Sequence, residues 1–163
     1  MEAATLIECP PAVSREEATD GAFSKELQNL WFALAARPWS ALAVVPALGA
    51  NGAPKVATAL VEIGRRTTAD RSVALLDATA APVEQVPALV DELASRIAQG
   101  QRVVLAVDPL EENPASLALA SRCDAAVVCV TLGESDVKSA RETIERCGRT
   151  RFVGSVVLVP KER

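Results

Sequence analysis

The chain has 163 residues, half of them hydrophobic and 3% aromatic, with a formal net charge of −4. This length suits one domain with a sizeable core, and the acidic balance gives no electrostatic attraction to nucleic acid or to an anionic membrane. The chain has no histidine and no tyrosine, which excludes histidine-based catalysis, histidine metal ligands and autophosphorylation on tyrosine.

The N-terminal segment shows no regular period. Residues 1–21 contain two adjacent prolines and several charges, which predicts a flexible leader before a single domain over residues 22–163. The leader lacks the basic start of a secretory signal, and the longest apolar stretch, residues 30–50, is interrupted by an arginine and two prolines. A cytoplasmic protein is therefore expected. Apolar residues at helical spacing then predict a helix over 24–36, with Ser24 as its N-cap.

Five short apolar runs follow, alternating with helical segments. The runs are residues 41–46, 72–76, 102–107, 125–131 and 152–159, and the helical segments are residues 54–66, 83–99, 114–122 and 135–147. Nearly continuous runs of Val, Leu and Ala are typical of strands that are buried on both faces. The order predicts an α/β fold with a doubly wound, mostly parallel sheet of about five or more strands and helices on both faces.

The most informative segment is the glycine-rich turn between the first strand and the following helix, Gly49-Ala50-Asn51-Gly52-Ala53-Pro54. A strand, a glycine-rich turn and a helix together form the geometry that holds nucleotide phosphates on backbone N–H groups. The turn therefore predicts a loop derived from a phosphate-binding site. The alternative is an ordinary strand–helix turn with proline in the first helical turn, where proline is favoured.

The residues that should carry phosphate chemistry are missing from this turn. Ala53 and Pro54 occupy the positions of the lysine and the magnesium-binding hydroxyl, and Pro54 also removes an N–H donor. Lys55 comes two positions late, which turns its side chain about 200° from the required direction on a helix. Lys55 remains a candidate phosphate ligand only if the loop rearranges.

Two carboxylates end neighbouring apolar runs. Asp77 and Asp108 would lie at the carboxyl ends of parallel strands, where α/β folds bind ligands and where a nucleotide hydrolase holds magnesium. The alternative is that each carboxylate caps the turn that follows it. Glu111 and Glu112 are interpreted as part of a solvated loop rather than a cation site. Asp136 is interpreted as a helix N-terminal residue.

Three of the aromatic residues lie close together in the sequence. Phe32 is expected to pack in the core, whereas Trp31 and Trp39 are retained as candidates for contact with a partner. The four cysteines include no CxxC pair and are interpreted as reduced, partly buried thiols: Cys9, Cys123, Cys129 and Cys147.

The order of these segments resembles the ATPase domain of bacterial tyrosine kinases, which are MinD/ParA-like P-loop proteins of exopolysaccharide synthesis. The resemblance covers about residues 22–159 and consists of segments 22–32, 49–60, 73–79, 104–109 and 115–124, followed by Gly133, Ser135 and residues 153–157. It implies a P-loop ATPase fold, and it implies that the family's Walker A loop falls on residues 49–54.

The sequence departs from this family where the family carries function. Beside the changes at residues 53 and 54, the second acid of the family's Asp-x-Asp pair is Thr79, and the asparagine that reads the base falls on Leu158. The family's ring contact falls on Gly21, Ser24 and Leu27, and its tyrosine-rich tail has no counterpart.

Three hypotheses follow. The first is an inactive ATPase-like scaffold or regulatory subunit of an exopolysaccharide or capsule assembly. It has no cofactor, and Asp77 and Asp108 remain as vestiges of the catalytic site. Its expected partner, by resemblance, is an integral-membrane chain-length regulator at the inner membrane, or a second copy of the chain. The second is a residual nucleotide binder or weak ATPase holding ATP and Mg²⁺. The third is an unrelated Rossmann-like regulatory module. Enzymatic activity is left open, with inactivity favoured.

Overall fold

A computed structural model of the chain describes residues 5–9, 25–50, 52–67 and 72–159. It contains one six-stranded sheet in the order β1-β6-β5-β2-β4-β3, and every pairing in it is parallel. The strands are β1 (Thr5–Cys9), β2 (Ala41–Pro46), β3 (Val73–Asp77), β4 (Arg102–Ala106), β5 (Ala125–Thr131) and β6 (Phe152–Leu158). The predicted parallel α/β sheet is confirmed.

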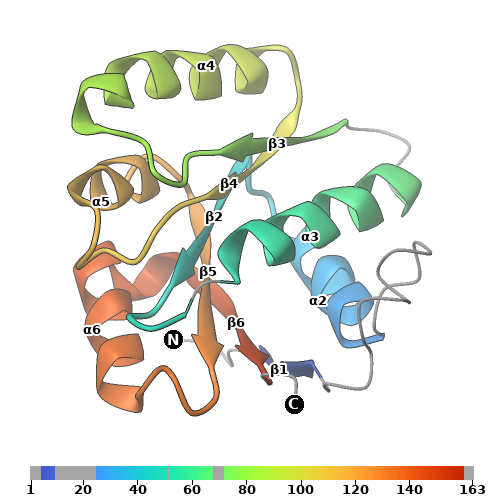
Figure 1. Cartoon of the computed structure of the whole chain (residues 1–163). Coiled ribbons are helices and arrows are strands. Elements are labelled where there is room, and N and C mark those ends of the chain that lie inside the picture. Colours follow the sequence, from blue (N-terminus) through green and yellow to red (C-terminus); the bar gives the residue numbers. More distant parts are fainter. Residues whose placement is uncertain (1–4, 10–24, 51, 68–71, 160–163) are drawn as a thin grey trace.

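Helices cover both faces of this sheet (Figure 1). Helices α2 (Lys25–Ala35) and α3 (Ala53–Thr67) lie on one face. Helices α4 (Val86–Ala98), α5 (Pro114–Ala120) and α6 (Val137–Cys147) lie on the other. Two short 3-10 segments, η1 (Val83–Gln85) and η2 (Arg149–Arg151), precede α4 and β6. None of the helices in the described part of the chain is long and apolar enough to cross a membrane.

The sheet separates two hydrophobic cores, because successive side chains of a strand point to opposite faces. Strand β2 is buried at every position: Leu42 and Val44 pack toward α2 and α3, while Ala43 and Val45 pack toward the other helical layer. Burial on both faces is why the strand sequences are continuously apolar rather than alternating. Because all the strand pairings are parallel, the carboxyl ends of the strands lie at one edge of the sheet, where the glycine-rich turn begins.

Residues 5–9 form a strand, although the sequence analysis predicted no regular structure before residue 22. Strand β1 pairs with β6 in parallel, with Thr5 opposite Gly154 and Cys9 opposite Leu158. A five-residue segment is too short to show a reliable period, but β6 offers a row of backbone groups that need partners. The remaining leader residues and Ser24 lie outside the described residues.

The prediction that Trp31 and Trp39 contact a partner is wrong. The two tryptophans are 0% and 2% exposed, and their rings meet edge to face with centroids 6.0 Å apart. Phe32, which was expected in the core, is 54% exposed. The reason is that α2 packs on α3 at Gly64, where the missing Cβ makes room for the Trp31 ring. Phe32 is then turned about 100° away from that contact.

Candidate functional site

The glycine-rich turn runs from Pro46, which ends β2, to Ala53, which begins α3. The amide of Ala47 donates to the Cys129 carbonyl at 2.8 Å, and the amide of Ala50 donates to the Ala47 carbonyl at 2.9 Å. Two backbone N–H groups of the loop are thus used within the fold rather than directed at a ligand. The first intrahelical bond of α3 runs from Val56 N to Gly52 O at 3.0 Å. Asn51 lies outside the described residues.

Both glycines of the turn are in contact with other parts of the chain. Gly49 has φ +87°, and a Cβ built on it would overlap the carbonyl oxygen of Glu134. A Cβ built on Gly52 would overlap Leu158 Cδ1. The side chain of Leu158 therefore lies directly on the turn, at the position that the family resemblance gives to the base-reading asparagine. Close packing within the fold accounts for both glycines without a bound phosphate.

The start of α3 does not present a cation to the turn. Ala53 is buried at the first helical position, and Pro54 is half-buried at the second. Lys55 is exposed, whereas Val56 and Ala57 turn into the core. Lys55 takes part in none of the ion pairs formed among the described residues. None of these ion pairs therefore holds the Lys55 ammonium group over the turn.

The carboxylates that end β3 and follow β4 hold turns in place. Asp77 Oδ1 accepts hydrogen bonds from Thr79 N at 3.0 Å and Thr79 Oγ1 at 2.6 Å. Asp108 Oδ2 accepts from Ala80 N at 2.7 Å and from Asn113 Nδ2 at 3.0 Å. These bonds match the capping alternative. The family resemblance places a second acid at residue 79. Here the Thr79 hydroxyl donates a hydrogen bond to the Asp77 carboxylate instead.

Asn113 is a residue that the sequence analysis missed. It is the N-cap of α5, with its Oδ1 accepting from Ala115 N at 3.0 Å. Its Nδ2 donates to Ala81 O as well as to Asp108, which links the two turns. The signal was present in the sequence, because asparagine directly before Pro114 is a typical helix start.

The other acidic residues also have structural contacts. Glu111 forms an ion pair with Arg146 at 3.8 Å, and Glu112 is exposed. In the described part of the chain, no group of three or more metal-binding side chains could hold an ion. Asp136 is the N-cap of α6, and its bond from Ser139 N lowers the pKa of its carboxyl. The interpretation of Asp136 as a helix N-terminal residue is confirmed.

Asp124 acts at the opposite end of the sheet from the turn. Its carboxylate accepts hydrogen bonds from Ser40 N at 2.9 and 3.2 Å and from Ala41 N at 2.8 Å. Ser40 directly precedes β2 and Ala41 is its first residue, while Ala125 begins β5 directly after the aspartate. The carboxylate therefore joins the amino ends of two neighbouring strands.

Comparisons with known proteins place the chain by its fold. No protein-family model matches, and no curated protein matches. Among solved structures, the chimeric protein CapA2B2 aligns with a TM-score of 0.69 at 11% identity, covering 94% of this chain and 92% of that chain. The chain has the fold of a bacterial tyrosine kinase domain. The BceF tyrosine kinase domain aligns with a TM-score of 0.59 at 10% identity, covering 98% of this chain and 92% of that one.

The likeness to the tyrosine kinase fold extends over nearly the whole chain. It confirms the parallel α/β architecture that the sequence predicted. At 10% and 11% identity it concerns the backbone arrangement and not the chemistry of individual side chains. The role of the glycine-rich turn in this chain depends on its own contacts.

Proposed function

We propose that the chain is a tyrosine-kinase-like domain that neither binds nor hydrolyses ATP. The observation that carries this proposal is the packing of Leu158 and the Glu134 carbonyl onto the glycines of the turn. A phosphate would need the N–H groups of this turn, a cation and a hydroxyl at once. Ala53 supplies no cation, Pro54 supplies neither hydroxyl nor N–H, and the Ala50 amide is already bonded.

The cost of these changes can be estimated. Charge-assisted hydrogen bonds contribute about 1.5–3 kcal/mol each, so losing the lysine and hydroxyl contacts removes several kcal/mol of binding free energy. Each 1.4 kcal/mol is a factor of ten in affinity, so about 4 kcal/mol weakens binding roughly a thousandfold. Micromolar binding of ATP is therefore not expected.

The direct test is calorimetric titration of the folded chain with ATP or ADP and Mg²⁺, beside a thermal-shift measurement. We expect no saturable heat and no change in melting temperature. A second candidate, residual nucleotide binding, keeps support from the positions of Asp77 and Asp108 at the carboxyl ends of β3 and β4. It predicts a clear thermal shift that Lys55→Ala and Asp108→Asn both remove. Lys55→Ala is suited to this test because the side chain is exposed.

The same domain is proposed to serve as a scaffold or regulatory subunit in exopolysaccharide or capsule synthesis. This part rests on the family resemblance and on the tyrosine kinase fold. The proposed partner is an integral-membrane chain-length regulator, which would bring the domain to the inner membrane from the cytoplasm. Because the chain contains no tyrosine, it would act by contact and not by autophosphorylation.

The scaffold role is tested by complementation. Deleting the gene in the source organism should reduce surface polysaccharide, and expressing the wild-type chain should restore it. Lys55→Ala and Asp108→Asn should restore it equally well, because neither nucleotide nor magnesium is needed. Failure of both variants, with normal folding by circular dichroism, would favour the nucleotide-dependent candidate instead. Unchanged polysaccharide in the deletion strain would reject the role itself.

A further inference from the structure

Helix α6 carries a groove on the molecular surface. A hollow of about 360 Å³ is lined by residues of α6 and η2: Val137, Ala140, Arg141, Ile144 and Arg149. We call these five residues the α6 groove. Val137 is 75% exposed, which is unusual for an aliphatic side chain beside other apolar residues. The α6 groove is therefore an apolar surface with a guanidinium group at two of its positions.

The positive charge of the groove is only partly balanced. Arg149 is paired with Glu145 at 3.7 Å, but both side chains are more than half exposed, so the pair is weak. Arg141 is exposed and joins none of the ion pairs among the described residues. A partner that fits must offer carboxylates beside small or apolar side chains.

A surface of that chemistry is present on α4 of the same chain. Its solvent face consists of small and acidic residues at helical spacing: Glu84, Ala88, Asp91, Ser95 and Ala98. We call these residues the α4 face. All five are exposed, whereas the larger apolar residues of α4, with Leu93 fully buried among them, pack against the core. The face thus combines two carboxylates with shallow positions that can receive larger side chains.

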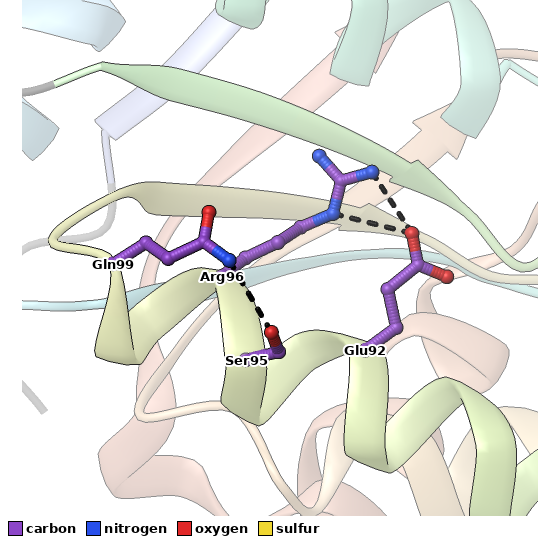
Figure 2. Close-up of polar contacts among 4 residues, drawn as sticks. All are labelled: Glu92, Ser95, Arg96 and Gln99. Carbon is purple, nitrogen blue, oxygen red and sulfur yellow. Dashed lines mark hydrogen bonds and ion pairs between the residues drawn. The ribbon is translucent and has the colours of Figure 1, made fainter.

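The acidic residues of the α4 face are not neutralised from within the helix. Arg96 is the single basic residue of α4, and Figure 2 shows its guanidinium group held by Glu92. The bonds measure 2.8 Å and 3.2 Å to Glu92 Oε1. Glu84 and Asp91 take part in no ion pair among the described residues. Their charges remain available to a second molecule.

The two surfaces also match in spacing. From Ala88 to Ser95 on α4 and from Val137 to Ile144 on α6, each helix rises about 10 Å at 1.5 Å per residue. In an antiparallel arrangement with Arg141 opposite Asp91, the apolar side chains of the groove meet the small residues of the face. Ile144 then lies opposite Ala88, and Val137 lies opposite Ser95.

We propose that the α6 groove of one copy binds the α4 face of a second copy in an antiparallel, head-to-tail contact. Helices α4 and α6 lie at opposite ends of one helical layer, with α5 between them (Figure 1). A copy that binds through one surface therefore leaves its other surface open. Contacts of this kind build rings or open chains rather than closed dimers.

This contact is independent of the proposed function and of the family's ring contact. The resemblance places that ring contact on residues 21, 24 and 27, of which Leu27 lies on α2, on the other face of the sheet. A single pair of helices buries less surface than a standard interface, so weak association is expected. Because the contact includes charge pairs, it should weaken as salt is added.

The test is sedimentation velocity with charge-reversal variants at concentrations up to about 0.5 mM, since small interfaces are weak. The average mass of the wild type should rise with concentration. Arg141→Glu and Asp91→Arg should each remain monomeric, and the double variant carrying both should associate again. Lys138→Glu is the matched control, because it reverses a charge on α6 outside the groove. This control should associate like the wild type.

Mixing the two single variants gives the sharpest result. Arg141→Glu keeps an intact α4 face and Asp91→Arg keeps an intact α6 groove, and the two substituted surfaces are complementary to each other. An equimolar mixture should therefore associate as far as the wild type, although each variant alone stays monomeric. Circular dichroism melts verify that every variant is folded. A monomeric wild type at the highest concentration overturns the proposal. So does a mixture that stays monomeric, or a Lys138→Glu control that loses association as fully as Arg141→Glu.

Discussion

Replacing Asp124 by alanine should destabilise the domain strongly, although the side chain is exposed and lies far from the glycine-rich turn. The carboxylate accepts hydrogen bonds from two backbone amides at the start of β2, Ser40 N and Ala41 N. Ala41 is 1% exposed, so its amide finds no solvent when the carboxylate is removed. An unsatisfied buried amide costs about 1–3 kcal/mol, and bonds to a charged acceptor contribute about 1.5–3 kcal/mol each.

Allowing for solvent competition at the half-buried Ser40, we expect Asp124→Ala to lower the free energy of unfolding by about 2–4 kcal/mol. A domain of this size has an unfolding entropy of about 0.34 kcal/mol/K at its midpoint, so the melting temperature should fall by about 6–12 °C. Asp124→Asn keeps one acceptor oxygen and should lose about half as much. Urea denaturation followed by far-UV circular dichroism measures both values.

The matched control is Asp91→Ala, which removes an exposed carboxylate that joins no ion pair among the described residues. Surface substitutions of this kind change stability by no more than about 0.5 kcal/mol. If Asp124→Ala proves as mild as Asp91→Ala, the two amide bonds do not join the strands in solution, and the reasoning fails.

Three further predictions concern local packing and ionisation. Gly64→Ala should destabilise by about 1–2 kcal/mol despite the better helix propensity of alanine. The added Cβ would lie 2.7 Å from Trp31 Cζ2, so a urea double-mutant cycle with Trp31→Phe should show a favourable coupling. The pKa of Asp136 is lowered by its bond from Ser139 N. The difference in melting temperature between wild type and Asp136→Ala should therefore be largest at neutral pH, and it should shrink as the pH falls below 3.8. Burial raises the pKa of Cys123 to about 12, so mass spectrometry should find it unlabelled by a thiol reagent at pH 8 until the protein is unfolded.

Each of these three predictions has a contrary outcome. Additive effects of Gly64→Ala and Trp31→Phe would mean that the ring does not occupy the space beside the glycine. A gap for Asp136→Ala that stays unchanged however far the pH is lowered while the protein remains folded would mean that the N-cap acts through its shape and not its charge. Rapid labelling of Cys123 in the native protein would show that the core around α5 opens readily.

The regular elements of the fold could be predicted from the sequence because burial on both faces leaves a clear pattern. Strands β2 and β5 have the predicted bounds, and the helices begin and end within a few residues of expectation. Helix α3 begins one residue early because Gly52 O accepts its first hydrogen bond. Helix α6 begins two residues late because Asp136 is its N-cap.

Contacts between distant segments could not be predicted in this way. The burial of Trp31 depends on Gly64, about thirty residues away along the chain, and Trp39 is buried against Trp31 and Arg102. The close packing of Leu158 on Gly52 depends on β6 lying beside β5, and no local sequence pattern predicts that pairing. Asn113, in contrast, was available as a helix-start signal and was overlooked.

The pairing of β1 with β6 has a consequence for the order of folding. Thr5 is translated long before its partner Gly154. The sheet can therefore assemble from β2 to β5 during synthesis, but its outer row of backbone hydrogen bonds closes only after β6 has been translated. Until then the segment that becomes β1 has no strand to pair with. This long-range pairing should be slow compared with the formation of the helices.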